Sequence, residues 1–190
     1  MEIVSGITLQ KFSLNNLSVT GITRIVEILF IIFVVVKCGD GLSETGLDPA
    51  DLINGFKKGL VWSVCFGLVT SVTAAIIFFA GINPLTLLKI SLPKKPGDLM
   101  VFLLIAGIVG PIAEELFFRG IVFGFFRRWG FFAALALSTL FFVFLHSSQG
   151  VPVTQIVGGT LFAIAYEIEG SLITPITIHI LGNMALFALS

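Results

Sequence analysis

Long apolar segments separated by short polar stretches dominate this chain. The first two cover residues 22–36 and 59–82. Four more lie in the second half, at residues 99–126, 131–146, 153–166 and 171–189. A helix needs about 20 apolar residues to cross the ~30 Å hydrocarbon layer of a bilayer. The pattern therefore predicts an all-α, polytopic membrane helical bundle of about six transmembrane helices, of which the fifth is short for a full crossing.

The polar stretches divide this membrane domain into three regions. Residues 1–21 are predicted to form a polar N-terminal leader, residues 22–98 the N-terminal transmembrane helices and their connectors, and residues 99–190 the C-terminal transmembrane core. Asp48, before Pro49, is the predicted N-cap of a short surface helix over residues 49–56. Arg24 and Glu27 are predicted to lie at headgroup level, because they stand near the start of the first apolar segment and long side chains reach water there.

The composition supports the membrane prediction and argues against a soluble domain or a nucleic-acid-binding protein. The 190 residues are 56% hydrophobic and 12% charged, with a mean hydropathy of +1.08, whereas a soluble domain carries about 25% charged residues. The formal net charge is zero, so we expect no nucleic-acid partner. We expect a multi-pass integral membrane protein whose surface faces the lipid bilayer. Lysine and arginine divide equally between the two sides of a six-span topology, so charge does not set the orientation, and the sequence leaves the oligomeric state open.

The informative residues are polar ones inside or at the end of apolar segments: Glu114, Glu115, Arg119, His146, His179 and Asn183. An ionised side chain at mid-membrane costs ~3 kcal/mol or more, so such groups face the bundle interior and have partners there. Glu115 and Arg119 are four apart, which predicts an ion pair on one helix face. Glu114 points about 100° away from Glu115 around the helix and is free to face a different neighbour, such as a cavity. A carboxylate, two imidazoles and the carboxamide of Asn183 can therefore converge from three separate helices.

Each of these residues also has a structural explanation, such as an ion pair or hydrogen bond that joins helices. Intramembrane glutamate and histidine are also used by transporters and proton relays. A transporter therefore remains an alternative, as does a non-catalytic membrane immunity or scaffold protein. Zinc could be bound by Glu114, His146 and His179, but the His-Glu-x-x-His pattern is absent. We therefore expect no cofactor, with zinc as the alternative.

Three motifs resemble the CAAX-protease and bacteriocin-processing family, whose eukaryotic members trim prenylated proteins. The first is the pair Glu114-Glu115 with Arg119 four residues after the second glutamate. The second is Phe-x-x-x-His, ending at His146, and the third is His-x-x-x-Asn, ending at Asn183. They stand in the family's order, each on an apolar segment, and the resemblance covers about residues 98–190. The first half is similar to the family only in having hydrophobic spans.

The resemblance implies an intramembrane glutamic-type protease. Glu114 would be the general base, His146 would help to hold the attacking water, and His179 and Asn183 would stabilise the oxyanion. The site would be held in shape by Glu115, Arg119 and Phe142. The implied partner is a membrane-anchored or lipid-linked protein or peptide, such as a CAAX-type protein, a bacteriocin leader or a C-terminal sorting tag. The expected location is the prokaryotic plasma (inner) membrane.

Overall fold

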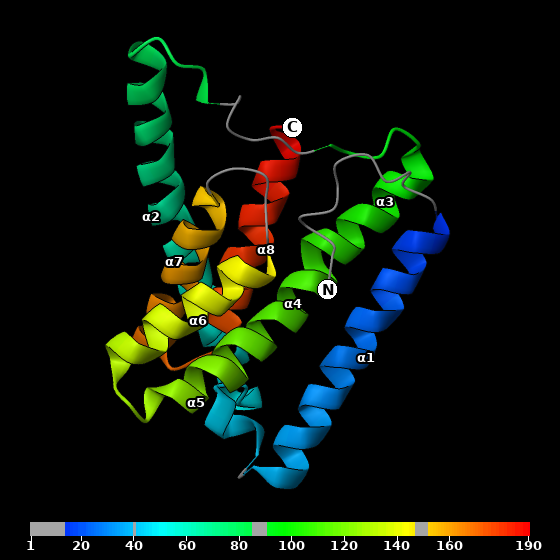
Figure 1. The fold of residues 1–190 in the computed structure, drawn as a ribbon, viewed down its shortest axis with the longest axis vertical. Coiled ribbons are helices and arrows are strands. Elements are labelled where there is room, and N and C mark those ends of the chain that lie inside the picture. Colours follow the sequence, from blue (N-terminus) through cyan, green and yellow to red (C-terminus); the bar gives the residue numbers. More distant parts are fainter. Residues whose placement is uncertain (1–13, 40, 85–90, 147–151) are drawn as a thin grey trace.

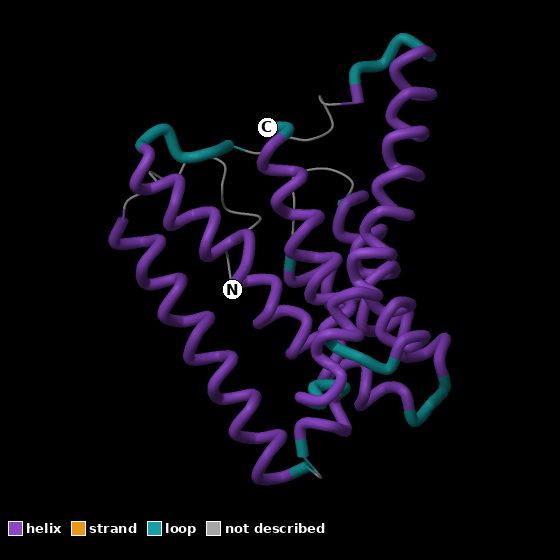
Figure 2. The backbone as a smooth tube through the Cα atoms, turned by 180° about the vertical axis from the view of Figure 1, so that it is seen from behind, coloured by secondary structure: helices purple, strands orange, loops and turns teal. Residues whose placement is uncertain are grey.

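The computed structural model describes residues 14–39, 41–84, 91–146 and 152–190. Over these residues the chain forms six helical rods and no strand (Figures 1 and 2). The predicted all-α bundle is therefore confirmed. Long apolar helices satisfy their backbone hydrogen bonds internally, which is what a lipid environment requires.

The first two rods are α1 (Leu14–Cys38) and α2 (Leu52–Phe79), joined through the 3-10 turns η1 (Leu42–Thr45) and η2 (Pro49–Asp51). α1 begins inside the stretch predicted to be a leader, and residues 1–13 of that stretch lie outside the described residues. The Asp48 side chain accepts a hydrogen bond from the Ala50 N–H at 2.9 Å, so the predicted cap is confirmed. The helix that it caps continues into α2 instead of forming a separate surface helix.

The third rod, Pro96–Arg127, is continuous. Its successive parts are α3 (Pro96–Leu104), η4 (Ile105–Val109), α4 (Gly110–Glu115), η5 (Leu116–Phe123) and α5 (Gly124–Arg127). The segments η4 and η5 are wide, π-helical turns. Such turns occur often at functional sites, and here they lie on either side of the short α-helical stretch that carries Glu114 and Glu115. Pro111 favours the irregularity, because it has no N–H to donate to the preceding turn.

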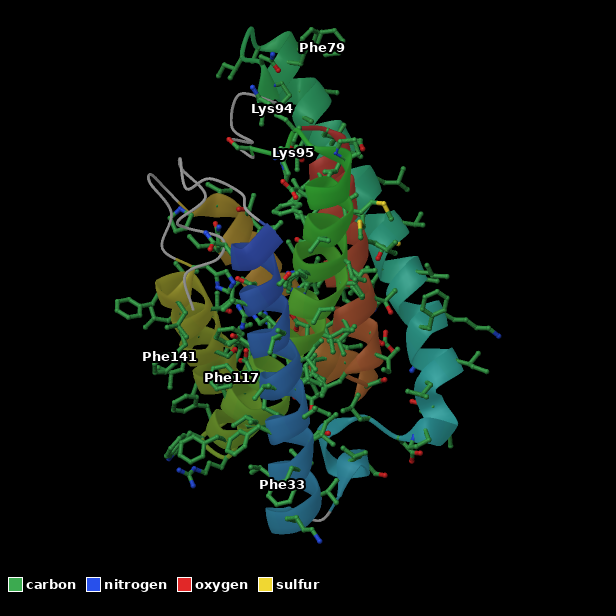
Figure 3. The ribbon with its side chains drawn as sticks, turned by 90° about the vertical axis from the view of Figure 1, so that its right-hand side faces the viewer. Phe33, Phe79, Lys94, Lys95, Phe117 and Phe141 are labelled. Carbon is green, nitrogen blue, oxygen red and sulfur yellow. The ribbon has the colours of Figure 1, made fainter. Side chains whose placement is uncertain are left out.

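The last three rods are α6 (Phe131–Leu145), α7 (Val153–Glu169) and α8 (Ile173–Ala188). Three stretches, Asn16–Lys37, Pro49–Phe79 and Pro96–Arg127, are long and apolar enough to cross a membrane, and α6 and α8 are shorter apolar helices. Large apolar side chains cover the outside. Phe79, Lys94 and Lys95 lie toward one end of the bundle, and Phe33 lies toward the other (Figure 3). The chain is an integral membrane protein.

Helix α8 packs against α2, α7 and α4, so it ties the two halves of the chain together (Figure 1). Its most extensive contact is with α2, where Gly55 and Gly59 are four residues apart. A Cβ atom on Gly59 would lie 2.5 Å from the Cβ atom of Thr177. The hydroxyl of Thr174 donates to the carbonyl of Gly55 at 3.1 Å. Small residues at this spacing let two membrane helices approach closely.

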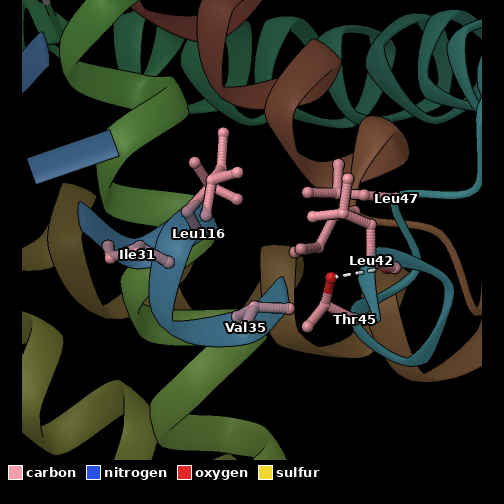
Figure 4. Close-up of a pocket in the computed structure, with 9 residues that line it drawn as sticks. Ile31, Val35, Leu42, Thr45, Leu47 and Leu116 are labelled. Carbon is pink, nitrogen blue, oxygen red and sulfur yellow. Dashed lines mark hydrogen bonds between the residues drawn. The ribbon is translucent and has the colours of Figure 1, made fainter. Parts of the chain in front are cut away.

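A pocket between α1, η1 and η5 is lined almost wholly by apolar side chains (Figure 4). Its one polar side chain, Thr45, donates its hydroxyl hydrogen to the carbonyl of Leu42 at 2.8 Å. Around it Ile31, Leu116 and Leu172 belong to one buried cluster, and the packing leaves no space for even a water molecule. This pocket is part of the core that seats α1, and the candidate chemistry lies elsewhere.

Candidate active site

Three side chains from three different helices meet inside the bundle. Glu114 comes from α4, His146 follows the last turn of α6, and His179 comes from α8. The Oε2 atom of Glu114 lies 3.2 Å from Nε2 of His146 and 3.8 Å from Nε2 of His179. Their side chains are only 8%, 9% and 8% exposed, in that order. The predicted convergence of a carboxylate and two imidazoles is therefore found, and the roles of the three groups stay predictions.

The His146 ring is fixed by the residue one turn before it. Its Nδ1 atom lies 2.7 Å from the carbonyl oxygen of Phe142, and the Phe142 ring stacks on the imidazole with centroids 4.2 Å apart. A carbonyl can only accept, so Nδ1 carries the hydrogen. The other nitrogen, Nε2, then needs a second proton to bond with Glu114. The contact is favourable when the Glu114–His146 pair holds one proton between Oε2 and Nε2.

Beside the Glu114–His146 contact, the third rod carries an ion pair between Glu115 and Arg119. Nη1 of Arg119 is 3.0 Å from Oε1 of Glu115, and both side chains are fully buried. The predicted four-residue pair is confirmed. Nη2 of Arg119 donates to the carbonyl of Gly159 at 2.9 Å, which joins this pair to α7. The pair therefore joins the third rod to α7 beside the site.

Glu115 also orients His179. Nδ1 of His179 lies 2.8 Å from Oε1 of Glu115, and the Phe162 ring stacks on the imidazole at 4.6 Å. With Nδ1–H committed to this carboxylate, Nε2 of a neutral His179 can only accept a hydrogen bond. The predicted oxyanion donor would therefore need to be an imidazolium.

Asn183 lies one turn after His179 on α8. Its Nδ2 atom donates to the carbonyl of Ala106 at 3.0 Å. Ala106 belongs to the wide turn η4, so the amide ties α8 to the irregular part of the third rod. A carboxamide has two N–H bonds, and the second is the one that an oxyanion would use. The predicted role of Asn183 stays a prediction.

Arg24 was missed by sequence reasoning as part of this site. It is 8% exposed, and its Nη2 atom lies 3.2 Å from Oε1 of Glu114. The prediction that Arg24 lies in the first turn of the helix was wrong, because α1 starts at Leu14. An arginine in an apolar segment is itself an expensive charge. The rule that singled out Glu114 could have found its partner.

Among the candidate metal ligands, Glu114 contacts His146 at 3.2 Å, and His179 lies 3.8 Å from the same oxygen. Within the segments that the structure describes, no group of three or more His, Cys, Asp and Glu side chains is arranged to hold a metal ion. Zinc binding by these residues stays a prediction, which a chelator can test.

Comparison with known proteins bears on the same residues. Residues 96–185 match the family of type II CAAX prenyl endopeptidases, Rce1-like. This match confirms the resemblance for that part of the chain, and it spans all three motifs while leaving α1 outside.

Two curated relatives align with less than half of the chain. One is named "Putative membrane peptidase YdiL", from Bacillus subtilis, and is 31% identical over 84 residues. The other is named "Membrane-embedded CAAX protease MroQ", from Staphylococcus aureus, and is 31% identical over 90 residues. Each alignment covers 44% of this chain, and 34% and 36% of the respective relatives. The chain thus spans about a third of the length of these relatives. No solved structure matches it.

Proposed function

We propose that this protein is an intramembrane endopeptidase in which Glu114 activates water to cleave an amide bond of a membrane-anchored protein. The observation that carries the proposal is the buried contact of Glu114 with His146, with His179 close by. It lies within the residues that match the prenyl endopeptidase family. A buried carboxylate beside two imidazoles is suited to general acid–base work.

The geometry constrains where the attacking water binds. Oε2 of Glu114 and Nε2 of His146 touch at 3.2 Å, so no water lies between them. The water binds beside this pair, on the side where Nε2 of His179 stands 3.8 Å from the same oxygen. A neutral His179 accepts one hydrogen bond from this water, and Glu114 removes the other hydrogen as a proton.

The remaining steps use the same groups. The water oxygen attacks the carbonyl carbon, and the carbonyl oxygen becomes an oxyanion, which the second N–H of Asn183 stabilises. The oxyanion then re-forms the C=O bond as the C–N bond breaks. One of the two protons now on the Glu114–His146 pair passes to the departing amine nitrogen, which returns the pair to its starting state with one proton. Removing one oxyanion donor typically costs ~10²-fold or more in rate. The Asn183→Ala variant is therefore expected to cleave peptide slowly but to keep measurable activity.

The experiment is peptide cleavage by detergent-purified protein, with prenylated, otherwise lipidated and unmodified peptides. Glu114→Gln keeps the shape of the side chain but removes the base, so cleavage is expected to disappear while the fold survives. Glu167→Gln is the matched control, because Glu167 pairs with Arg127 at an exposed position outside the site. Wild-type cleavage by folded Glu114→Gln protein would refute the proposal.

A zinc chelator decides between the two forms of the chemistry. Cleavage that ignores the chelator supports attack by glutamate-activated water. Cleavage that the chelator abolishes would move the reaction to a zinc ion held by Glu114, His146 and His179, with the bound water as nucleophile.

The substrate and the location are part of the proposal. A relative named a CAAX protease and a family of prenyl endopeptidases favour a membrane-anchored protein as substrate. Both relatives come from bacteria, which favours the bacterial plasma membrane. Bacteriocin leaders and C-terminal sorting tags belong in the peptide panel, and preferential cleavage of one class identifies the substrate.

A further inference from the structure

The candidate site contains a charged group outside the residues that match the family. Arg24 lies on α1, and residues 96–185 carry the match. Its guanidinium bridges two carboxylates: Nη1 lies 2.7 Å from Oε2 of Glu27, and Nη2 lies 3.2 Å from Oε1 of Glu114. The side chains of Arg24 and Glu27 are 10% and 24% exposed, so the bridge runs from the buried site toward the outside of α1.

Each oxygen of Glu114 therefore has its own partner. Oε1 faces Arg24 and Oε2 faces His146. A carboxylate held from both sides cannot rotate freely, and its Oε2 atom stays directed toward the two imidazoles. The planar fork of an arginine suits this task, because it offers donors in fixed directions and is always charged.

The packing of α1 fixes the depth at which Arg24 meets Glu114. On one side, Leu17 packs with Phe102 and Ile105 in a buried cluster. On the other side, Ile31 packs with Leu116. These contacts, before and after Arg24 along the helix, set the register of α1 against the third rod. Gly21 permits the close approach, since a Cβ there would lie 2.8 Å from Cδ1 of Ile105.

We propose that Arg24 is a positioning residue for the reaction and that Glu27 positions Arg24. The proposal rests on the proposed function of Glu114 as the base. Arg24 holds the Glu114 carboxylate in its charged form and in one orientation, with Oε2 on the attacking water. It acts through Glu114 and does not touch the substrate, so its loss lowers kcat and leaves KM unchanged.

The test measures kcat and KM for Arg24→Gln, Arg24→Lys and Glu27→Gln on a peptide that the wild type cleaves. A misplacement of about 1 Å in a catalytic group can cost ~10²-fold in rate. Arg24→Gln is expected to lose ~10²-fold in kcat with KM within about twofold of the wild type. Arg24→Lys restores the charge without the fork and is expected to recover about a tenth of the wild-type kcat. Glu27→Gln is expected to lose ~3- to 10-fold, because Arg24 keeps its charge but loses its anchor.

Lys37→Gln is the matched control, since Lys37 is an exposed cation in the last turn of the same helix. Its kcat and KM are expected to equal those of the wild type. A folded Arg24→Gln protein with wild-type kcat would overturn the proposal, and so would a raised KM at unchanged kcat, which would make Arg24 a substrate-binding group. If Arg24→Gln does not fold, Glu27→Gln decides, and an unchanged kcat there overturns the proposal.

Different outcomes contradict the positioning role of Arg24 and the proposed function of Glu114. Cleavage that depends on Glu114 but ignores both Arg24 and Glu27 overturns the positioning role alone. Wild-type cleavage by Glu114→Gln overturns the proposed function itself.

Discussion

Replacing Gly59 with alanine should weaken the crossing of α2 and α8. A Cβ atom at this position would lie 2.5 Å from Cβ and 2.9 Å from Cγ2 of Thr177, and 3.0 Å from the carbonyl oxygen of Thr174. Carbon atoms in contact prefer about 3.5–4.0 Å, so the two helices must separate by about 1 Å. Because the position of a Cβ atom is fixed by the backbone, a change of the Thr177 rotamer cannot relieve the contact at 2.5 Å.

The magnitude follows from two opposing effects. Overpacking a tight contact costs ~1–3 kcal/mol, and alanine is favoured over glycine in a helix interior by ~1 kcal/mol. Gly67→Ala isolates the second effect, because Gly67 lies on the same helix and a Cβ atom there meets nothing within 4 Å. The free energy of unfolding of Gly59→Ala should therefore be lower than that of Gly67→Ala by ~1–3 kcal/mol.

The assay is unfolding of both variants in mixed micelles with increasing sodium dodecyl sulfate, followed by circular dichroism and tryptophan fluorescence. Trp62 reports on this region, because it lies on α2 and its Nε1–H donates to Oε1 of Glu169 at 2.8 Å. Equal stabilities of the two alanine variants would refute the reasoning, since they would show that α2 and α8 do not approach closely at Gly59.

Three further outcomes test individual polar contacts within the bundle. Glu115→Gln leaves the fully buried Arg119 without its anion and should cost ~3–5 kcal/mol of unfolding free energy in the same assay. Trp62→Phe removes the hydrogen bond to Glu169 and should cost about 1 kcal/mol, with the loss absent in a background that already lacks the carboxylate. Arg127→Gln breaks an exposed ion pair with α7 and should leave the unfolding midpoint unchanged at high salt.

The sequence predicts those parts of the site that depend on helical periodicity. The pairing of Glu115 with Arg119 follows from their spacing, and the divergence of Glu114 follows from the angle between successive residues. The polar contacts between helices are harder to predict. The spacing of Gly55 and Gly59 can be read from the chain, but nothing in α2 says that its partner is α8, because a helix does not encode the identity of its neighbour.

The sequence did not predict Arg24 as part of the site, for a different reason. The first helix was predicted to begin where the apolar run begins, which puts Arg24 in its first turn. The structure starts the helix at Leu14, since polar residues such as Asn16 and Ser18 do not interrupt backbone hydrogen bonding. When the first turns of a helix are polar, a helix start predicted from hydropathy alone therefore falls too late in the sequence.

Charge counting would have corrected that error. The predicted apolar segments 22–36 and 59–82 contain a single Lys or Arg, which is Arg24. A cation inside an apolar segment needs a partner in the bundle interior. Within residues 96–185 the buried centre offers two carboxylates, Glu114 and Glu115. Glu115 already pairs with Arg119, so Glu114 is the one left for Arg24, and their contact makes α1 part of the site.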